Sequence, residues 1–174
     1  MNAGRQPAAI VVRDAVPADD GAVGELLVAA YMTQYARKLP DVQLSDARLA
    51  DLRDQADKRT SATVLVAEVD GRIAGAVTIY PPNAPRSEAW IPGAADLRFL
   101  AVAVDLQGRG LSHRLLDEAE QRAREWHVPA ICLHVRRGAE GVARLYMSRG
   151  YRRDEAGDID KRPMIFLEAY ALSL

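Results

Sequence analysis

The segment Val104–Ala123, "VDLQGRGLSHRLLDEAEQRA", limits the fold of this chain more than any other stretch. It joins an apolar run at Asp96–Val104, typical of a buried strand, to apolar residues that recur at helical spacing. Gly108 and Gly110 lie between the two. A strand that enters a helix through such a turn leaves backbone N–H groups without acceptors at the positive end of the helix dipole, which favours an anion. A tight turn alone would also account for both glycines.

The first half of the chain is predicted to contain a strand, two helices and a hairpin. Ala8–Ala15 is rich in β-branched residues, as strands are. Apolar residues at helical spacing predict a helix over about 18–35, and similar spacing after Ser45 predicts a more polar helix that runs to about Lys58. Asp70-Gly71 separates two strand-like runs, which predicts a β-hairpin.

The second half alternates strands with helices. Pro81–Ala95 is rich in proline and lacks periodicity, which predicts a long surface loop. After the glycine turn and its helix, Ala130–Val135 is predicted to be a buried strand, and a short helix near Tyr146 ends at Gly150. Two last strands are expected around residues 151 and 164–170. The order β α α β β β α β α β β predicts a single domain over residues 1–174 with a mixed sheet covered by helices on both faces.

Composition excludes several classes of function. The chain has 23 basic and 24 acidic residues, so general binding to nucleic acid or to an anionic membrane is not expected. Cys132 is the only cysteine, which excludes an internal disulfide and a thiolate metal cluster. The N-terminal residues lack the apolar run of a signal peptide, and no stretch approaches the ~20 apolar residues of a membrane span. These features predict a cytoplasmic protein.

The glycine turn fits neither of the two common nucleotide-binding motifs. No P-loop run occurs, and Gly108-x-Gly110 lacks the third glycine of a dinucleotide-binding turn. The turn instead resembles the acyl-CoA pyrophosphate loop of the GNAT family of N-acetyltransferases, with the pattern Q/R-x-x-G-x-G/A. Here Gln107, Gly110 and Ser112 take the three positions. The serine departs from the pattern, but it is small and its hydroxyl can add a phosphate contact.

The resemblance extends over nearly the whole chain. "DLRFLAVAVDLQGRGLSHRLL" is similar to the fourth strand and third helix of the family, "ICLHVRRGAEGVARLYMSRGY" to its fifth strand and fourth helix, and "VVRDAVPADDGAVGELL" to its opening. It implies a mixed α/β (α+β) fold with a mostly antiparallel central sheet of about seven strands. Helices would cover both faces of this sheet, and its fourth and fifth strands would splay apart.

The resemblance implies acetyl-CoA as cosubstrate and no metal. The pantetheine arm would pair with the backbone of the fourth strand, and the pyrophosphate would bind at the glycine turn. The implied cofactor-binding residues are Leu100, Ala101, Val102, Gln107, Gly108, Arg109, Gly110, Leu111 and Ser112. An asparagine that often precedes the fourth helix is replaced by Ala139, so one polar contact to the pantetheine arm is expected to be missing.

Two catalytic residues are also implied by the resemblance. Tyr146 stands where family members carry a tyrosine directed at the thioester sulfur, which makes it the candidate general acid; an aromatic core residue is the alternative. Asp96 stands where some members carry a catalytic glutamate, and other members use ordered water instead. An Asp96 that simply begins the strand in solvent is the other interpretation. His134 has no metal-ligand partner at suitable spacing and is expected to be structural, with a catalytic role as the less favoured alternative. Cys132 is expected to be a core residue, because no base that would activate it is evident.

The predicted function is transfer of an acetyl group to a primary amine by direct attack in a ternary complex. The acceptor is expected to be a small molecule or a peptide, and the family resemblance allows a homodimer. Candidates to line the acceptor cleft are Tyr31, Tyr35, Glu88, Trp90 and the acidic segment 154–160, whose acids would favour a cationic amine. A solvated loop or helix end is the simpler explanation for each of them taken individually. A non-catalytic acyl-CoA-binding or regulatory domain, or an interaction domain that binds no ligand at the turn, are the alternatives.

Overall fold

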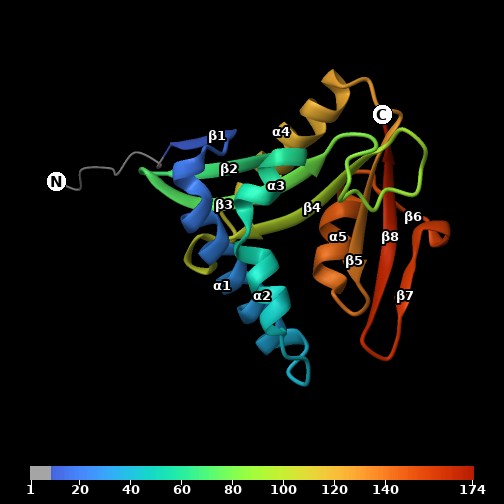
Figure 1. Ribbon diagram of the computed structural model, residues 1–174, viewed down its shortest axis with the longest axis horizontal. Helices are drawn as coiled ribbons and strands as arrows, with labels where there is room; N and C mark the ends of the chain where they lie inside the picture. The colour runs from blue at the N-terminus through green and yellow to red at the C-terminus, as the bar shows by residue number, and fades with distance from the viewer. Residues whose placement is uncertain (1–8) are drawn as a thin grey trace.

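The computed structural model describes residues 9–174 of the chain. Ala8, at which the first predicted strand begins, and most of the N-terminal stretch that argues against a signal peptide lie outside the described residues. The helices and strands follow the predicted order with small additions (Figure 1). They are β1 (Ile10–Asp14), η1 (Pro17–Asp19), α1 (Asp20–Lys38), α2 (Asp46–Arg53), α3 (Gln55–Ser61), β2 (Thr63–Val69), β3 (Arg72–Tyr80), β4 (Ala95–Val102), η2 (Val104–Leu106), α4 (Leu111–Glu125), β5 (Ala130–Arg136), α5 (Glu140–Ser148), β6 (Arg152–Arg153), η3 (Glu155–Gly157), β7 (Ile159–Lys161) and β8 (Ile165–Ser173).

All eight described strands belong to one sheet with the order β1-β2-β3-β4-β5-β8-β6, and β7 pairs with β8. Every pairing is antiparallel except that of β4 with β5. The predicted mixed, mostly antiparallel sheet is therefore confirmed. The strand beyond the predicted seven is β7, which has three residues and pairs with β8 from Ile159↔Leu167 to Lys161↔Ile165. A strand of three residues is too short to show the alternation of apolar and polar residues by which strands are predicted from sequence.

Helices pack on both faces of the sheet, as predicted (Figure 1). In β2 the side chains alternate: Leu65 and Ala67 join the core formed with α4 and α5, whereas Val64 and Val66 join the core formed with α1 and α2. All four side chains are buried. The period of two along a strand thus divides the apolar residues between two cores.

The predicted helix from Ser45 to Lys58 is divided into α2 and α3 at Asp54. Asp54 leaves the helical conformation (φ −78°, ψ 78°), and its carboxylate accepts a hydrogen bond from the N–H of Asp57, which starts a new helix. The ammonium of Lys58 is buried and binds the carbonyls of Asp51 and Asp54 at the break. These bonds are made in three dimensions, and the helical spacing of the apolar residues does not reveal the interruption.

Candidate active site

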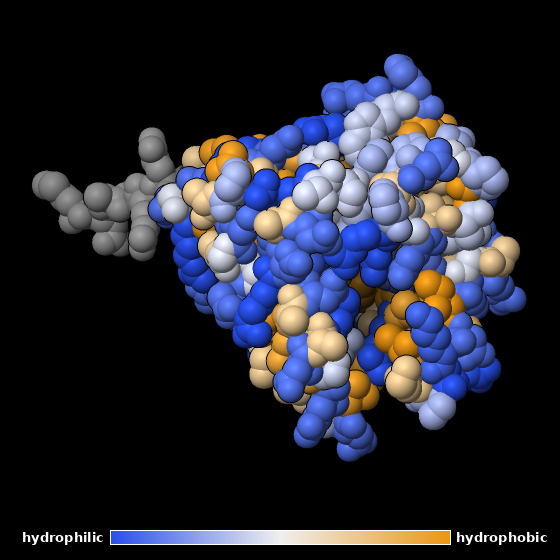
Figure 2. All heavy atoms as spheres, in the orientation of Figure 1, coloured by the Kyte–Doolittle hydropathy of each residue, from blue (hydrophilic) through white to orange (hydrophobic). Residues whose placement is uncertain are grey.

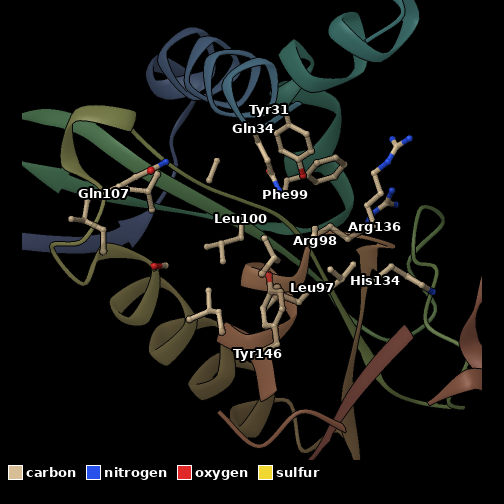
Figure 3. Close-up of a pocket in the computed structure, with 18 of the residues that line it drawn as sticks. Tyr31, Gln34, Leu97, Arg98, Phe99, Leu100, Gln107, His134, Arg136 and Tyr146 are labelled. Carbon is tan, nitrogen blue, oxygen red and sulfur yellow. The ribbon is translucent and has the colours of Figure 1, made fainter. Parts of the chain in front are cut away.

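A cavity of about 300 Å3 lies between α1, the second half of β4, the end of β5 and α5. Figure 2 shows the molecule hollowed in this region, with hydrophobic side chains inside the hollow. The cavity runs from Gln107 at one end, past Tyr146, to His134 and Arg136 at the other (Figure 3). Residues from α1, β4, the turn before α4, β5 and α5 therefore meet in one elongated space.

One wall of the cavity is a strand edge that has no partner. The parallel pairing of β4 with β5 runs only from Ala95↔Ile131 to Leu97↔Leu133. Beyond Leu97 the two strands diverge, which confirms the predicted splay. A break in the register between β3 and β4 lies opposite this point. Residues 100–102 line the cavity, and on the side away from β3 no strand of the described chain pairs with them.

Phe99 produces this divergence through an unusual backbone conformation. Its φ is 59°, in the left-handed region that costs a residue with a bulky side chain about 1–3 kcal/mol. The ring is buried, with the Lys58 ammonium 4.9 Å and the Arg48 guanidinium 5.4 Å from its centroid. This packing and the cation–π contacts hold the strained backbone in place. Sequence reasoning missed Phe99, because phenylalanine does not favour a positive φ.

The glycine turn presents free backbone donors at the other end of the cavity. Gly108 and Gly110 have φ values of 76° and 81°, and no atom lies within 4 Å of the position that a Cβ would take at either residue. Residues 107–110 donate no backbone hydrogen bond to the described residues outside helices and strands. The first bond of this kind comes from the N–H of Arg114 to the carbonyl of Gly110. The start of α4 is therefore a set of open N–H groups beside free space.

The structure brings most of the predicted cofactor-binding residues to the cavity. Those that line it are Leu100, Ala101, Val102, Gln107, Gly108, Leu111 and Ser112. Arg109 is exposed on the turn, and Gly110 is the N-cap of α4. Neither of these two lines the cavity. Ala139 is the N-cap of α5, lines the cavity and makes no side-chain capping bond, so its position offers no polar side chain.

Tyr146 occupies the middle of the cavity. It comes from α5, is only 5% exposed, and its ring points across the cavity toward β4 (Figure 3). The ring of Tyr151 packs edge-to-face against it, with 5.4 Å between centroids. Burial raises the pKa of the Tyr146 phenol above its usual value, so the hydroxyl keeps its proton through the neutral range. A buried, protonated hydroxyl in a cavity can act as a proton donor.

Asp96 is fully buried and does not line this cavity. Its Oδ2 accepts a hydrogen bond of 2.7 Å from the N–H of Glu88, and Oδ1 has no partner among the described residues. Burial raises the pKa of Asp96 to about 6. The interpretation of Asp96 as a solvated residue at the start of the strand is therefore wrong. The loop that contains Glu88 covers the carboxylate.

His134 lines the cavity, although sequence reasoning gave it a structural role. Its Nε2 lies 2.8 Å from the carbonyl oxygen of Gly157, and its ring lies 5.2 Å from that of Trp90. Because a carbonyl only accepts, Nε2 carries the hydrogen, and Nδ1 of the neutral ring is left as an acceptor. His134 is two residues from Cys132, which pairs with Asp96. His134 and Asp96 therefore project from the same face of neighbouring strands.

Cys132 is a buried core thiol, as predicted. It is fully buried against Ala94 and Ala130, and burial raises its pKa above the usual value. A thiol that is kept protonated and away from solvent is a poor nucleophile.

The acidic segment 154–160 does not line the cavity. Asp154 accepts a hydrogen bond from the indole N–H of Trp90 at 2.8 Å, and neither residue lines the cavity. Asp158 is paired with Arg153, and Asp160 with Arg162, each at 2.6 Å. Arg153 and Arg162 thus neutralise Asp158 and Asp160, a pairing that the run "DEAGDID" by itself does not show. Of the other candidates, Tyr31 and Tyr35 line the cavity and Glu88 lines a neighbouring one.

Within residues 9–174, no helix combines the length and the apolar character needed to cross a membrane. The same part of the chain contains no group of three or more histidine, cysteine, aspartate or glutamate side chains placed to hold a metal ion.

Comparison with known families identifies the family of this chain. The sequence model described as the acetyltransferase (GNAT) family matches residues 24–151, which include the splayed strands, the glycine turn and Tyr146. The chain belongs to the GNAT family. This family is one of acyltransferases, the enzyme class that the sequence predicts.

Proteins similar to this chain support its assignment to the GNAT family. An uncharacterized N-acetyltransferase from Lactobacillus delbrueckii subsp. lactis is 30% identical over 86 residues, which cover 49% of this chain and 49% of the relative. This match thus spans about half of the relative's length. A GNAT acetyltransferase from Staphylococcus aureus has the same fold, with a TM-score of 0.74 and 15% identity over 95% of this chain and 99% of the other. A GNAT acetyltransferase from Elizabethkingia anophelis, solved with acetyl-CoA bound, has a TM-score of 0.61 and 18% identity over 95% and 98% of the chains.

Proposed function

We propose that this chain transfers an acetyl group from acetyl-CoA to a primary amine by direct attack in a ternary complex. The observation that carries the proposal is the single cavity that joins a free strand edge, a turn of open N–H groups and the Tyr146 hydroxyl. Acetyl-CoA in the Elizabethkingia relative supports the choice of cosubstrate. The proposal treats residues 1–174 as one domain, since all the described strands form one sheet.

The residues present fit coenzyme A. The open space beside Gly108 and Gly110 would receive the diphosphate, whose charge suits the start of α4 and the exposed guanidinium of Arg109. The unpaired edge at 100–102 would hydrogen-bond the pantetheine amides as an added strand does. Bound acetyl-CoA supplies an acetyl group activated as a thioester. Tyr146 would hold a proton for the departing sulfur.

A proton acceptor is needed as well, because a lysine-like ammonium with a pKa near ~10.4 is mostly protonated at neutral pH. We assign this role to Asp96, whose carboxylate is ionised above about pH 6 and has one oxygen without a partner. Because Asp96 does not line the cavity, the proton must reach it through water or through His134. His134 itself is the second candidate, since its Nδ1 is an acceptor.

Amine-dependent release of free CoA thiol tests the proposed function. An enzyme releases thiol from acetyl-CoA only when a suitable amine is added, and the acetylated amine appears in equal amount. A non-catalytic acyl-CoA-binding domain would be stabilised by CoA but would release no thiol with any amine. A domain whose turn binds nothing would show no thermal stabilisation by CoA.

Gly110→Ala is expected to weaken CoA binding about tenfold. The φ of 81° at Gly110 costs alanine about 1–2 kcal/mol, so the turn relaxes and its N–H groups lose their arrangement. Isothermal titration calorimetry with CoA measures the effect. Gly21→Ala is the matched control, because Gly21 is an exposed residue of α1 with open space around its Cβ position. An unchanged Kd in a folded Gly110→Ala protein would contradict the assigned diphosphate site.

A further inference from the structure

A second cavity, of about 400 Å3, adjoins the first at the end opposite the glycine turn. The two cavities share lining residues that include Tyr35, Arg98 and Arg136, and Figure 3 shows Arg98 and Arg136 at the far end from Gln107. An acceptor amine can approach Tyr146 through this second cavity, from the side away from the turn. The charges that line the second cavity would then affect which amine binds.

The charges that line the second cavity are predominantly positive. Four cationic side chains face it, and Glu88 is the one carboxylate that lines it within the described residues. The cations are Arg48, Arg98, Arg136 and Lys161. An unmodified cationic amine such as a polyamine would meet repulsion here, because the net charge of the wall has the same sign.

Arg48 and Arg98 already have acidic partners. Arg48 pairs with Asp51 at 2.8 Å, and Arg98 lies 3.5 Å from Glu88. The carboxylate of Asp51 is also shared with Arg86 and with Lys58. Arg86 also pairs with Asp57, so two carboxylates serve three cations, and this group keeps an excess of positive charge.

Arg136 is held in place by neutral groups. Its guanidinium donates hydrogen bonds to the Tyr35 hydroxyl at 3.2 Å and to the Met164 carbonyl at 3.4 Å, and it lies 5.1 Å from the Tyr35 ring centroid. It is half-buried and has no ion pair within the described chain. The Arg136 guanidinium is therefore held in a fixed orientation at the cavity, and its charge is not neutralised. Such a guanidinium can bind a carboxylate or a phosphate through two hydrogen bonds.

Lys161 adds a second unneutralised cation. It is exposed at the end of β7 and has no ion pair within residues 9–174. The acids on β7 and β8 are engaged elsewhere, since Asp160 pairs with Arg162 and Glu168 pairs with Arg137. The excess of positive charge is thus a property of the cavity and is not offset by its neighbours.

We propose that the acceptor is an amine that also carries an anionic group, a carboxylate or a phosphate, and that Arg136 and Lys161 bind this group. The inference rests on the proposed acetyl transfer and specifies its substrate class. It replaces the expectation of a purely cationic acceptor. Because the two cations lie at the end of the cavity away from Gln107, their site is separate from the one assigned to the CoA diphosphate.

Thiol release from acetyl-CoA with matched pairs of amines tests the proposal. The carboxylate arm compares amino acids with their amides, and the phosphate arm compares O-phosphoethanolamine with ethanolamine. We expect kcat/KM for an anionic amine to exceed that for its neutral partner by at least tenfold in one arm. Arg136→Gln should lower this ratio about 10- to 100-fold, because a charge-assisted hydrogen bond to the anion is lost. Lys161→Gln should lower it less, since the site is exposed.

The controls separate this proposal from the transfer itself. Arg124→Gln removes an exposed arginine of α4 outside both cavities and should leave the ratio unchanged. Titration with CoA should give the same Kd for Arg136→Gln and the parent. If neutral amines react as well as anionic ones, or if the ratio survives both substitutions, the anion site is overturned while acetyl transfer stands. If no amine releases thiol, the proposed function falls and this inference falls with it.

Discussion

Tyr146→Phe is expected to lower kcat for amine-dependent thiol release by about 100-fold or more, with the Kd for CoA changed by less than about threefold. The substitution removes only the hydroxyl, and the ring can keep its edge-to-face contact with Tyr151. General acid catalysis contributes typically 10²–10⁴-fold to a rate. Because burial raises the pKa of the Tyr146 phenol, the hydroxyl stays protonated over the whole pH range of the assay. The fold decrease in kcat should therefore be the same at every pH. Steady-state kinetics of the parent and the variant from pH 6 to 9 measure this decrease in kcat.

Tyr151→Phe is the matched control for this experiment. The Tyr151 hydroxyl is buried without a partner among the described residues, and Tyr151 does not line the cavity. The same chemical change at Tyr151 should leave kcat near the parent value. Unchanged turnover in Tyr146→Phe would remove this residue from the mechanism, and equal losses in the two variants would show that packing, and not proton donation, is responsible.

Asp96→Asn is expected to lower kcat/KM about 100-fold at pH 7.5 and at the same time to raise the free energy of unfolding. The loss of activity follows if the carboxylate takes the proton of the amine. A base with a pKa of about 6 must be ionised, so the parent should lose activity as the pH falls through about 6. This acidic limb should be absent from the pH profile of Asp96→Asn, a result that a purely structural role would not produce.

The gain in stability follows from the direction of the pKa shift. The carboxyl pKa rises from 3.8 to about 6 on folding, so the folded state binds the proton more tightly than the unfolded state. The contribution of Asp96 to stability therefore falls as the pH rises from about 4 to about 6, by about 3 kcal/mol, and stays low above that range. Asparagine carries no such charge and can still accept from the N–H of Glu88. Urea denaturation at pH 8 and pH 4.5 should show that the stability gain of the variant is larger at pH 8.

His134→Gln distinguishes the two candidate bases. The glutamine amide can keep the hydrogen bond to the Gly157 carbonyl, so the fold should be retained. If Asp96 is the base, this variant keeps an acidic limb near pH 6. If the limb is lost in His134→Gln and kept in Asp96→Asn, His134 is the base and Asp96 has no part in proton transfer.

Much of the fold could be predicted from local patterns. The β2–β3 hairpin followed from Asp70-Gly71, and both residues have the positive φ that such a turn requires. The burial of Leu115 and Leu116 followed from their helical spacing. Gly108 and Gly110 marked the turn before α4, because glycine adopts a positive φ at no steric cost. Each of these features depends on interactions within a few residues, so it can be predicted directly from the sequence.

The amino-acid sequence by itself determined the order of the elements, the family and the turn at residues 107–112, because periodicity and turn chemistry act over short distances. Only the tertiary structure decided that Phe99 carries the strained backbone, that Asp96 lies beneath a loop, and that Asp158 and Asp160 are paired with arginines. It also decided that Arg136 lines the end of the cavity away from Gln107 and has no ion pair in the described chain. These features depend on which charged and apolar groups meet across long separations in the chain, and the free energy of each group is set by those neighbours.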